Sequence, residues 1–420
     1  MEDINRSSDI NLDVLSSVFD RINKTAAFHS LRTLEIFDDP EATYQHQLHL
    51  FPTSTPNLVD LKFYVGNVPE ISAATFLYTI SSESRNLKSL VLGNGPWTKT
   101  ILDVLPCFRK LQLLEIQELD CHNPVDFLKT CALSMASLRS LSVSLLSVGD
   151  FGQPGVSRDS DLGLITLGLL SILDLTGYFR DVENMLNILF VPKLDTLRLD
   201  FQCEDEMITG ISPFIEGFLT TNGQHLKDGL RTLDLRTDST RSSIENYLDS
   251  FKAFIKLDSL HVWPSGFQRD HLSASGLASF LHENKPWSDL TCICLDGGHV
   301  RVDSDQIDDT LSIATLPLLA DTFPKLLHLV ISICNPDQAA MKTVTMDATR
   351  TPHGLETLKF ICGLPQDWIY STSSAVAFAS FLHQLFPKLK KVACYNRSEW
   401  INEVQEMLKK EERASCIRSD

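Results

Sequence analysis

The sequence predicts an α/β solenoid, in which each repeat adds one strand to a parallel sheet and helices cover the other face of that sheet. Three observations carry this prediction. A short apolar hexad recurs thirteen times along the 420 residues. Its copies are spaced at intervals that fit known repeat proteins. Several of the segments between them carry apolar residues at helical spacing.

The hexad consists of an apolar residue, two variable residues, an apolar residue, one variable residue and a final apolar residue. Consecutive copies start 24 to 36 residues apart, with a mean close to 30. This mean lies at or just above the roughly 20 to 29 residues of common leucine-rich repeats. The thirteen copies start at Leu31, Leu58, Leu87, Leu111, Leu138, Leu170, Leu194, Leu230, Leu257, Leu290, Leu326, Leu355 and Leu389.

Each hexad is expected to form a short strand, because its apolar and variable residues alternate around the central apolar position. Strand followed by helix in every unit makes all the strands parallel. We therefore expect a leucine-rich-repeat horseshoe with a concave parallel sheet and convex helices. Asp181 and Ser243 are plausible helix N-caps. The expected helices are 181–190, 243–255, 273–284 and 374–386.

The chain is expected to contain a capped array rather than several globular domains. Residues 1–30 form an N-terminal helical cap around an amphipathic segment at 12–22, and residues 31–395 form about 13 irregular units. Residues 396–420 form a C-terminal helical cap and tail. Its helix, expected over 398–413, places Trp400, Ile401, Val404 and Met407 on one face.

The sequence leaves open whether the solenoid is kinked or interrupted at one place. The loop 149–161 is rich in Gly, Ser and Asp, and it precedes the weakest hexad, which starts at Leu170. A second soft region is expected at 296–309.

The charge and cysteine content favour some partners and compartments over others. The formal net charge of -17 argues against nucleic acid and anionic membranes, since both need a dense basic face. No apolar run approaches a membrane span, and the N-terminal residues lack the pattern of a secretory signal. Ten cysteines without such a signal indicate a reducing compartment, so we expect a cytoplasmic or nuclear protein. Core packing is the expected role of Cys107, Cys131, Cys292, Cys294, Cys334, Cys362 and Cys394.

The sequence offers no catalytic constellation, so a non-enzymatic protein without cofactor or metal is expected. Asp303 and Asp305 resemble the start of a calcium loop, but Asp308 stands where that loop needs glycine and Ala314 where it needs an acid. Cys292 and Cys294 flank Ile293 on the expected concave side without a second pair of ligands at metal spacing.

The concave side is the predicted binding surface, because an array of parallel strands offers a broad, ordered contact face. Its side chains are small hydroxyls, charges of both signs and some apolar groups, a mixture that suits a protein partner or a structured small ligand better than a polyanion. A binding role and a plain surface role both remain open for His261 and His328. The candidate contact residues are Glu35, Asp60, Lys62, Glu115, Asp174, Arg198, Asp234, His261, His328 and Lys359.

Several hexads follow proline or an aromatic residue with proline, as in 55–63 (TPNLVDLKF), 190–199 (FVPKLDTLRL), 323–331 (FPKLLHLVI) and 386–394 (FPKLKKVAC). In this style the chain resembles the fungal F-box/leucine-rich-repeat proteins. The resemblance implies a substrate-recruiting subunit of an SCF-type ubiquitin ligase, with a Skp-type adaptor as a second partner.

Members of that family usually begin with an F-box, and here only 11–21 (NLDVLSSVFDR) resembles its first helix. The F-box is therefore missing or truncated in this sequence, and we expect a partner or an upstream segment to supply it. The alternative function is a stand-alone leucine-rich-repeat scaffold, inhibitor or GTPase-activating regulator.

Overall fold

The structure is a computed structural model, and it confirms the expected α/β leucine-rich-repeat fold strand by strand. All thirteen hexads lie in or run into a described strand. The described residues are 29–37, 55–64, 66, 68–95, 97–120, 124–146, 163–202, 211–237, 251, 254–264, 277, 287–295, 311, 313–331, 352–360, 372–394 and 398–419.

The chain divides into two compact units. Unit 1 contains Met1–Gly177 and Ile188–Val191, and unit 2 contains Tyr178–Asn187 and Pro192–Asp420. The described strands of unit 1 pair in parallel and in sequence order, with one strand from each repeat. They are β1 (Thr33–Phe37), β2 (Asp60–Tyr64), β3 (Ser89–Gly93), β4 (Leu113–Leu119), β5 (Ser140–Leu145) and β7 (Ile172–Tyr178, the last residue lying in unit 2).

Unit 2 repeats the same arrangement. Its described strands also pair in parallel and in sequence order. They are β9 (Thr196–Gln202), β10 (Thr232–Thr237), β11 (Ser259–Pro264), β12 (Cys292–Leu295), β13 (His328–Ile331), β14 (Thr357–Phe360) and β15 (Lys391–Cys394).

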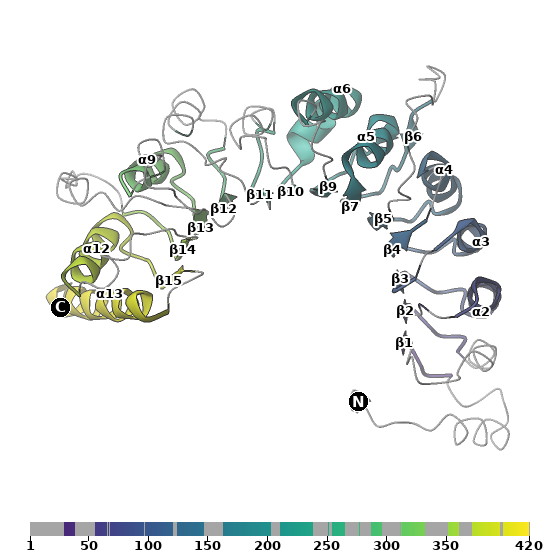
Figure 1. The fold of residues 1–420 in the computed structure, drawn as a ribbon, viewed down its shortest axis with the longest axis horizontal. Coiled ribbons are helices and arrows are strands. Elements are labelled where there is room, and N and C mark those ends of the chain that lie inside the picture. Colours follow the sequence, from purple (N-terminus) through teal and green to yellow (C-terminus); the bar gives the residue numbers. More distant parts are fainter. Residues whose placement is uncertain are drawn as a thin grey trace. The chain divides into compact units, whose positions relative to one another are not determined.

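Helices lie along one side of the strand ladder in each unit (Figure 1). None of the described helices is long and apolar enough to cross a membrane. Unit 1 contains α2 (Glu70–Glu83), α3 (Lys99–Leu102), the 3-10 helix η4 (Leu105–Cys107), α4 (Pro124–Ser134) and a small parallel pair, β6 (Ile165–Thr166) with β8 (Leu189–Phe190). Unit 2 contains α5 (Phe179–Ile188, the last residue lying in unit 1), α6 (Ile211–Gly229), α9 (Thr315–Thr322), α12 (Thr372–Leu385) and α13 (Ser398–Ser419).

The core lies between the strands and the helices. From β2 to β15 the central apolar residue of every hexad is buried, as are nearly all of the apolar residues at the two ends of the hexads. Burying one such side chain contributes about 1.5–3 kcal/mol. β1, the first described strand, differs: its Leu34 and Ile36 remain partly exposed.

A tight turn leads into many of the strands and explains the prolines that precede the hexads. The first leucine of the hexad donates its backbone N–H to the carbonyl three residues earlier, as in Leu326 to Phe323 (3.1 Å) and Leu389 to Phe386 (3.0 Å). Pro324 therefore occupies the second position of such a turn, where its fixed φ is favourable. Phe323 is buried, so the turn also fills the core.

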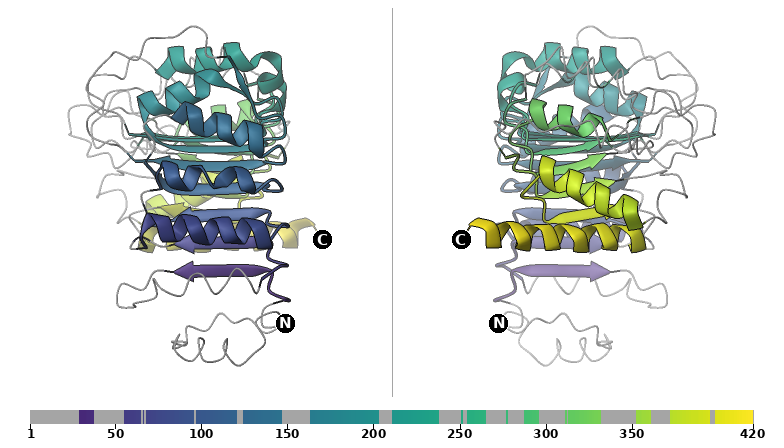
Figure 2. Two further views of the ribbon diagram at one scale, coloured as in Figure 1. Left: turned by 90° about the vertical axis from the view of Figure 1, so that its right-hand side faces the viewer. Right: turned by 90° about the vertical axis from the view of Figure 1, so that its left-hand side faces the viewer.

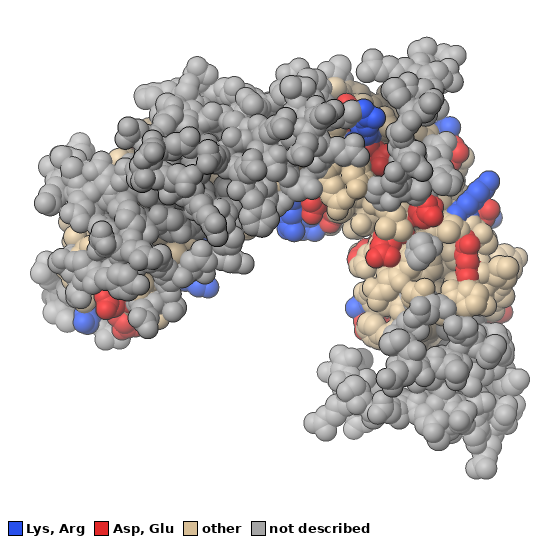
Figure 3. Space-filling view, in the orientation of Figure 1, with Lys and Arg blue, Asp and Glu red and all other residues tan. Residues whose placement is uncertain are grey.

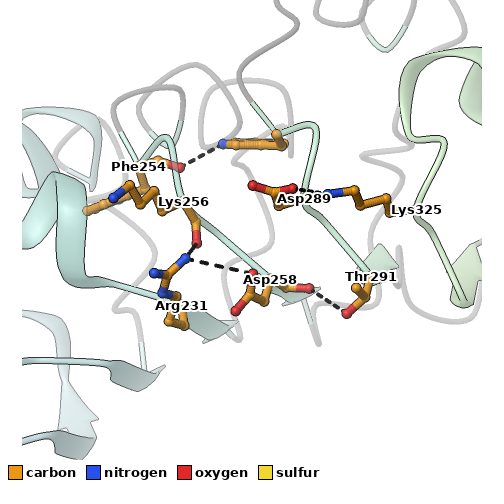
Figure 4. Close-up of polar contacts among 8 residues, drawn as sticks. Arg231, Phe254, Lys256, Asp258, Asp289, Thr291 and Lys325 are labelled. Carbon is orange, nitrogen blue, oxygen red and sulfur yellow. Dashed lines mark hydrogen bonds and ion pairs between the residues drawn. The ribbon is translucent and has the colours of Figure 1, made fainter.

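Polar contacts join one repeat to the next beside these turns (Figure 4). The indole of Trp287 donates to the carbonyl of Phe254 (2.9 Å), and the Thr291 hydroxyl donates to the carbonyl of Asp258 (3.0 Å). Lys325 forms an ion pair with Asp289 one repeat earlier. The Trp287 contact supplies a side-chain donor to a buried carbonyl, and such a group is costly to leave without a partner.

The C-terminal helix α13 packs beside α12 (Figure 2) and also contacts the last strand. The Gln405 side chain accepts the backbone N–H of Val392 (2.7 Å) and donates to the carbonyl of Lys390 (2.9 Å). One amide group thus satisfies a backbone N–H of β15 and the carbonyl of the residue just before that strand. Trp400, Ile401 and Val404 are buried as expected from the spacing.

Several expectations require correction. α5 begins at Phe179, so Asp181 lies in its first turn rather than at its N-cap, and β8 begins where the helix was expected to continue. β5 pairs in register with β7, so the ladder of unit 1 is not interrupted between them. Cys107 is exposed instead of buried. In α13, Leu408 is buried while Met407 is only partly buried.

Other predictions concern residues outside the described ranges. These are the helix at 12–22, nearly all of the helices at 243–255 and 273–284, the cap at Ser243, the loops 149–161 and 296–309, Cys334 and Cys362. The domain boundaries at 30 and 395 remain a prediction.

Candidate partner-binding face

The side of the strands opposite the helices carries three rows of side chains, and we call these rows the open face. The first row precedes the central apolar residue of each strand, the second follows it, and the third follows the last apolar residue. In-register pairing places the members of a row on adjacent strands. All ten residues that the sequence predicted for binding lie in the first two rows, eight of them in the second.

In unit 1 three of the six second-row residues are acidic. Lys62 forms an ion pair with Glu35, and this hydrogen-bonded contact raises the pKa of Lys62. Tyr64 and Glu115 raise the pKa of Lys62 further by their charges. The Gln117 amide donates to Glu115 (2.9 Å). Asp174 continues the row on β7, and Figure 3 shows acidic side chains over β4 and β5.

Asp60 extends the acidic character of unit 1 into the first row. Its carboxylate accepts a hydrogen bond from the Thr33 hydroxyl on the neighbouring strand (3.4 Å). The open face of unit 1 therefore holds four carboxylates, from Glu35, Asp60, Glu115 and Asp174, against the single ammonium of Lys62 in these rows.

In unit 2 the structure brings Asp234 and His261 together on β10 and β11. Asp234 is only 6% exposed, and its Oδ2 lies 3.3 Å from the Arg236 guanidinium and 3.9 Å from His261 Nδ1. Burial lowers the pKa of His261. The charge of Asp234 acts against this shift, and the charges of Arg236 and Arg198 lower the pKa further. The imidazole is therefore favoured in its neutral form near pH 7.

The other ring nitrogen of His261 faces two possible nucleophiles. Nε2 lies 3.1 Å from the Ser259 hydroxyl and 3.3 Å from the Cys292 thiol. Burial raises the pKa of Cys292, so the thiolate that nucleophilic chemistry requires is disfavoured. Ser259, His261 and Cys292 therefore form a neutral hydrogen-bonded cluster. Among the described residues no group of three His, Cys, Asp or Glu side chains could hold a metal ion.

Two polar atoms beside this cluster have no hydrogen-bond partner among the described residues. They are Oδ1 of Asp234 and Nε1 of Trp263, both buried. The Trp263 ring meets His261 edge to face, with centroids 6.5 Å apart. A buried polar atom without a partner costs about 1–3 kcal/mol, so a bound group that satisfies it would recover part of this energy.

The remaining predicted residues lie elsewhere on the same face. Arg198 is exposed on β9, His328 is exposed on β13, and Lys359 is partly buried on β14. Cys294, also expected on this side, is buried by its neighbours.

The third row, which contains Phe37, Tyr64, Arg236 and Trp263, was not among the residues predicted from the sequence. The signal was present, because the residue directly after each hexad continues the alternation of the strand. Extending the pattern by one residue would have identified these side chains.

One parallel strand per repeat of about 30 residues, backed by helices, defines the chain as a leucine-rich-repeat protein. No family model matches the sequence. No curated protein matches it either.

Solved structures with a similar fold include an internalin from Listeria monocytogenes, with 13% identity, a TM-score of 0.43 and coverage of 90% of this chain and 86% of the other. The Rad7 and Elc1 complex in yeast matches with 15% identity, a TM-score of 0.41 and coverage of 86% and 85%. The leucine-rich-repeat domain of APL1B matches with 14% identity, a TM-score of 0.35 and coverage of 94% of each chain.

Proposed function

We propose that the protein is a non-enzymatic binding module that recruits another protein through its open face. The observation that carries this proposal is the ordered display of polar and charged side chains on adjacent in-register strands in each unit. Such a face combines several hydrogen-bonding groups with few exposed aliphatic ones, which is typical of non-obligate protein interfaces.

We further propose that the bound protein is a substrate of an SCF-type ubiquitin ligase. The proline-containing turns before several hexads support this, since they resemble those of fungal F-box/leucine-rich-repeat proteins. A Skp-type adaptor would then bind near the segment 11–21, which resembles the first helix of an F-box.

Size-exclusion chromatography of the full chain mixed with a recombinant Skp-type adaptor tests the ligase role. We expect a one-to-one complex with the wild-type chain and a weaker complex with Val14→Asp, which places a charge in the F-box-like segment. Separate elution of the two wild-type proteins would exclude direct adaptor binding and leave the recruitment of a protein by the open face to be tested on its own.

The second candidate function is a stand-alone regulator, either an inhibitor or a GTPase activator. The exposed guanidinium groups of Arg198 and Arg236 on β9 and β10 favour it, because arginine can stabilise phosphoryl-transfer transition states. Stimulation of a GTPase by the wild-type chain and its loss in Arg198→Ala would support this function.

A further inference from the structure

An aromatic platform lies on the open face of unit 1. The Phe37 and Tyr64 rings are stacked with centroids 5.1 Å apart and an angle of 6° between their planes. Phe37 is 61% exposed, an unusual state for a phenyl ring in a strand. The two rings come from in-register third-row positions on β1 and β2.

The next strand leaves room for this platform. Gly93 occupies the third-row position of β3 beside Tyr64. A Cβ atom at residue 93 would lie only 2.3 Å from Cδ1 of Tyr64. The Tyr64 ring thus lies over Gly93, and a side chain at residue 93 would displace the ring. Glycine at this position therefore permits the stacking of Tyr64 with Phe37.

The groups around the platform are predominantly negative. Glu35 precedes Phe37 by two residues on the same face, and Asp60 lies in the first row of β2. Glu115 follows on β4 and is close enough to act on Lys62. Lys62 is already paired with Glu35, so the carboxylates of Asp60 and Glu115 are not balanced by a further cation in the described rows of unit 1.

Aromatic faces and carboxylates attract the same class of ligand. The face of an aromatic ring is electron-rich and binds cations, and a guanidinium can also stack flat against it. Nearby carboxylates add long-range attraction for the same cation. An acidic segment would be repelled here, and a purely apolar one would bring no cation to balance the charges of Asp60 and Glu115.

We propose that the Phe37–Tyr64 platform binds an arginine side chain of a basic segment in a protein partner, and that Glu115 and Asp60, farther along the same face, attract the other cations of that segment. This proposal rests on the proposed recruiting function and names the chemistry of the partner. Recognition of the partner by unit 1 then depends on stacking against the two rings as well as on charge.

Fluorescence anisotropy of a labelled eight-residue arginine peptide, titrated with the full chain, tests the proposal. We expect saturable binding that weakens as salt increases, and tighter binding than that of an eight-residue lysine peptide. Phe37→Ala should weaken binding by about two- to fivefold, the range that one exposed cation–π contact supplies. Gly93→Ala should weaken it as well, because the new Cβ displaces the Tyr64 ring.

Matched variants separate the site from the general acidity of the chain. Leu133→Ala removes an 86% exposed apolar side chain from α4 and should leave binding unchanged. Glu115→Gln should weaken binding, whereas Glu83→Gln, which removes the same charge from α2, should have a smaller effect. Absence of peptide binding, or equal affinities of wild type and Phe37→Ala, would overturn the proposal.

The result is independent of the adaptor experiment. If the peptide binds the platform while the adaptor does not bind the chain, the site stands and direct adaptor binding by this chain fails. If the adaptor binds and the peptide does not, the site fails while the ligase role stands.

Discussion

At the scale of single residues, the turns before the strands carry a repeated hydrogen bond to the preceding repeat. Trp287 Nε1 donates to the carbonyl of Phe254, and the Ser84 hydroxyl donates to that of Thr55 (2.7 Å). The His353 ring approaches the carbonyl of Phe323 at 2.8 Å in the same way. Different side chains thus perform one task, the satisfaction of a buried carbonyl of the previous turn.

Substituting Trp287 with phenylalanine tests the energy of this contact. Trp287→Phe keeps an aromatic ring against Phe323 but leaves the Phe254 carbonyl without its donor. We expect a loss of about 1–3 kcal/mol in the free energy of unfolding beyond the effect of ring size, measured by urea denaturation.

Trp97→Phe supplies the control for ring size, because the buried Trp97 Nε1 has no hydrogen-bond partner among the described residues. Trp97→Phe should lower the free energy of unfolding clearly less than Trp287→Phe does. Equal losses in the two variants would show that the Trp287 hydrogen bond contributes nothing.

The cysteines should differ in their reactivity toward iodoacetamide. Cys107 is exposed and should be alkylated first. Burial raises the pKa of Cys292, so its thiolate fraction is small and its alkylation should be slower, rising at higher pH than for a free cysteine. Cys131 is fully buried and should react last. Peptide mass spectrometry against time and pH measures this order, and faster reaction of Cys292 than of Cys107 would contradict it.

Residue-level prediction succeeded for the core and failed for the local environment. The central leucines and the outward direction of their neighbours follow from alternation within a single hexad. The contacts among Asp234, His261 and Cys292 do not follow from alternation within a hexad. These residues are about 30 residues apart and meet only through the register between strands. The burial of Asp234 beneath its neighbours also depends on that register.

At the scale of elements, strands were predicted better than helices. A hexad specifies its strand within six residues, but the segments between hexads vary in length and allow several helix boundaries. In α5 the buried Phe179 begins the helix, so Asp181 falls in the first turn, where burial raises its pKa. A capping residue chosen from the sequence alone was wrong because packing of Phe179 extended the helix toward its N-terminus.

The last strand offers an element-scale prediction. The outer edge of β15 would expose unpaired backbone groups, a liability for any sheet. Gln405→Ala removes the side chain that bonds Val392 N–H and Lys390 C=O. We expect faster hydrogen exchange at the Val392 amide, followed by mass spectrometry or NMR.

Gln405→Glu provides a graded control, since it keeps the acceptor for Val392 N–H and loses the donor to Lys390. Hydrogen exchange at the Val392 amide should be faster in Gln405→Glu than in the wild type and slower than in Gln405→Ala. Unchanged protection in Gln405→Ala would mean that α13 shields this edge by burial alone.

At the scale of the whole molecule, the repeat architecture was readable from the sequence and the distribution of charge was not. The net charge of -17 describes the whole chain, whereas the described open-face rows differ between the units. Unit 1 shows four carboxylates against Lys62. Unit 2 shows Arg198, Arg236, Lys359 and Lys391 against Asp200 and Asp234. Figure 3 shows basic side chains over β9 and β10.

The central claim is that the open face, rather than the helix side, recruits the partner. Two charge-matched double variants of the full chain test it. Glu115→Lys with Asp174→Lys alters the open face of unit 1, and Glu83→Lys with Asp103→Lys makes the same change in net charge on α2 and at the end of α3.

The decisive measurement is quantitative mass spectrometry of the proteins that each variant and the wild type retain from a cell lysate. We expect the proteins held by the wild type to remain with the helix-side variant and to be lost, by about tenfold or more, from the open-face variant. Retention of the same proteins by the open-face variant, or their equal loss from both, would contradict the central claim.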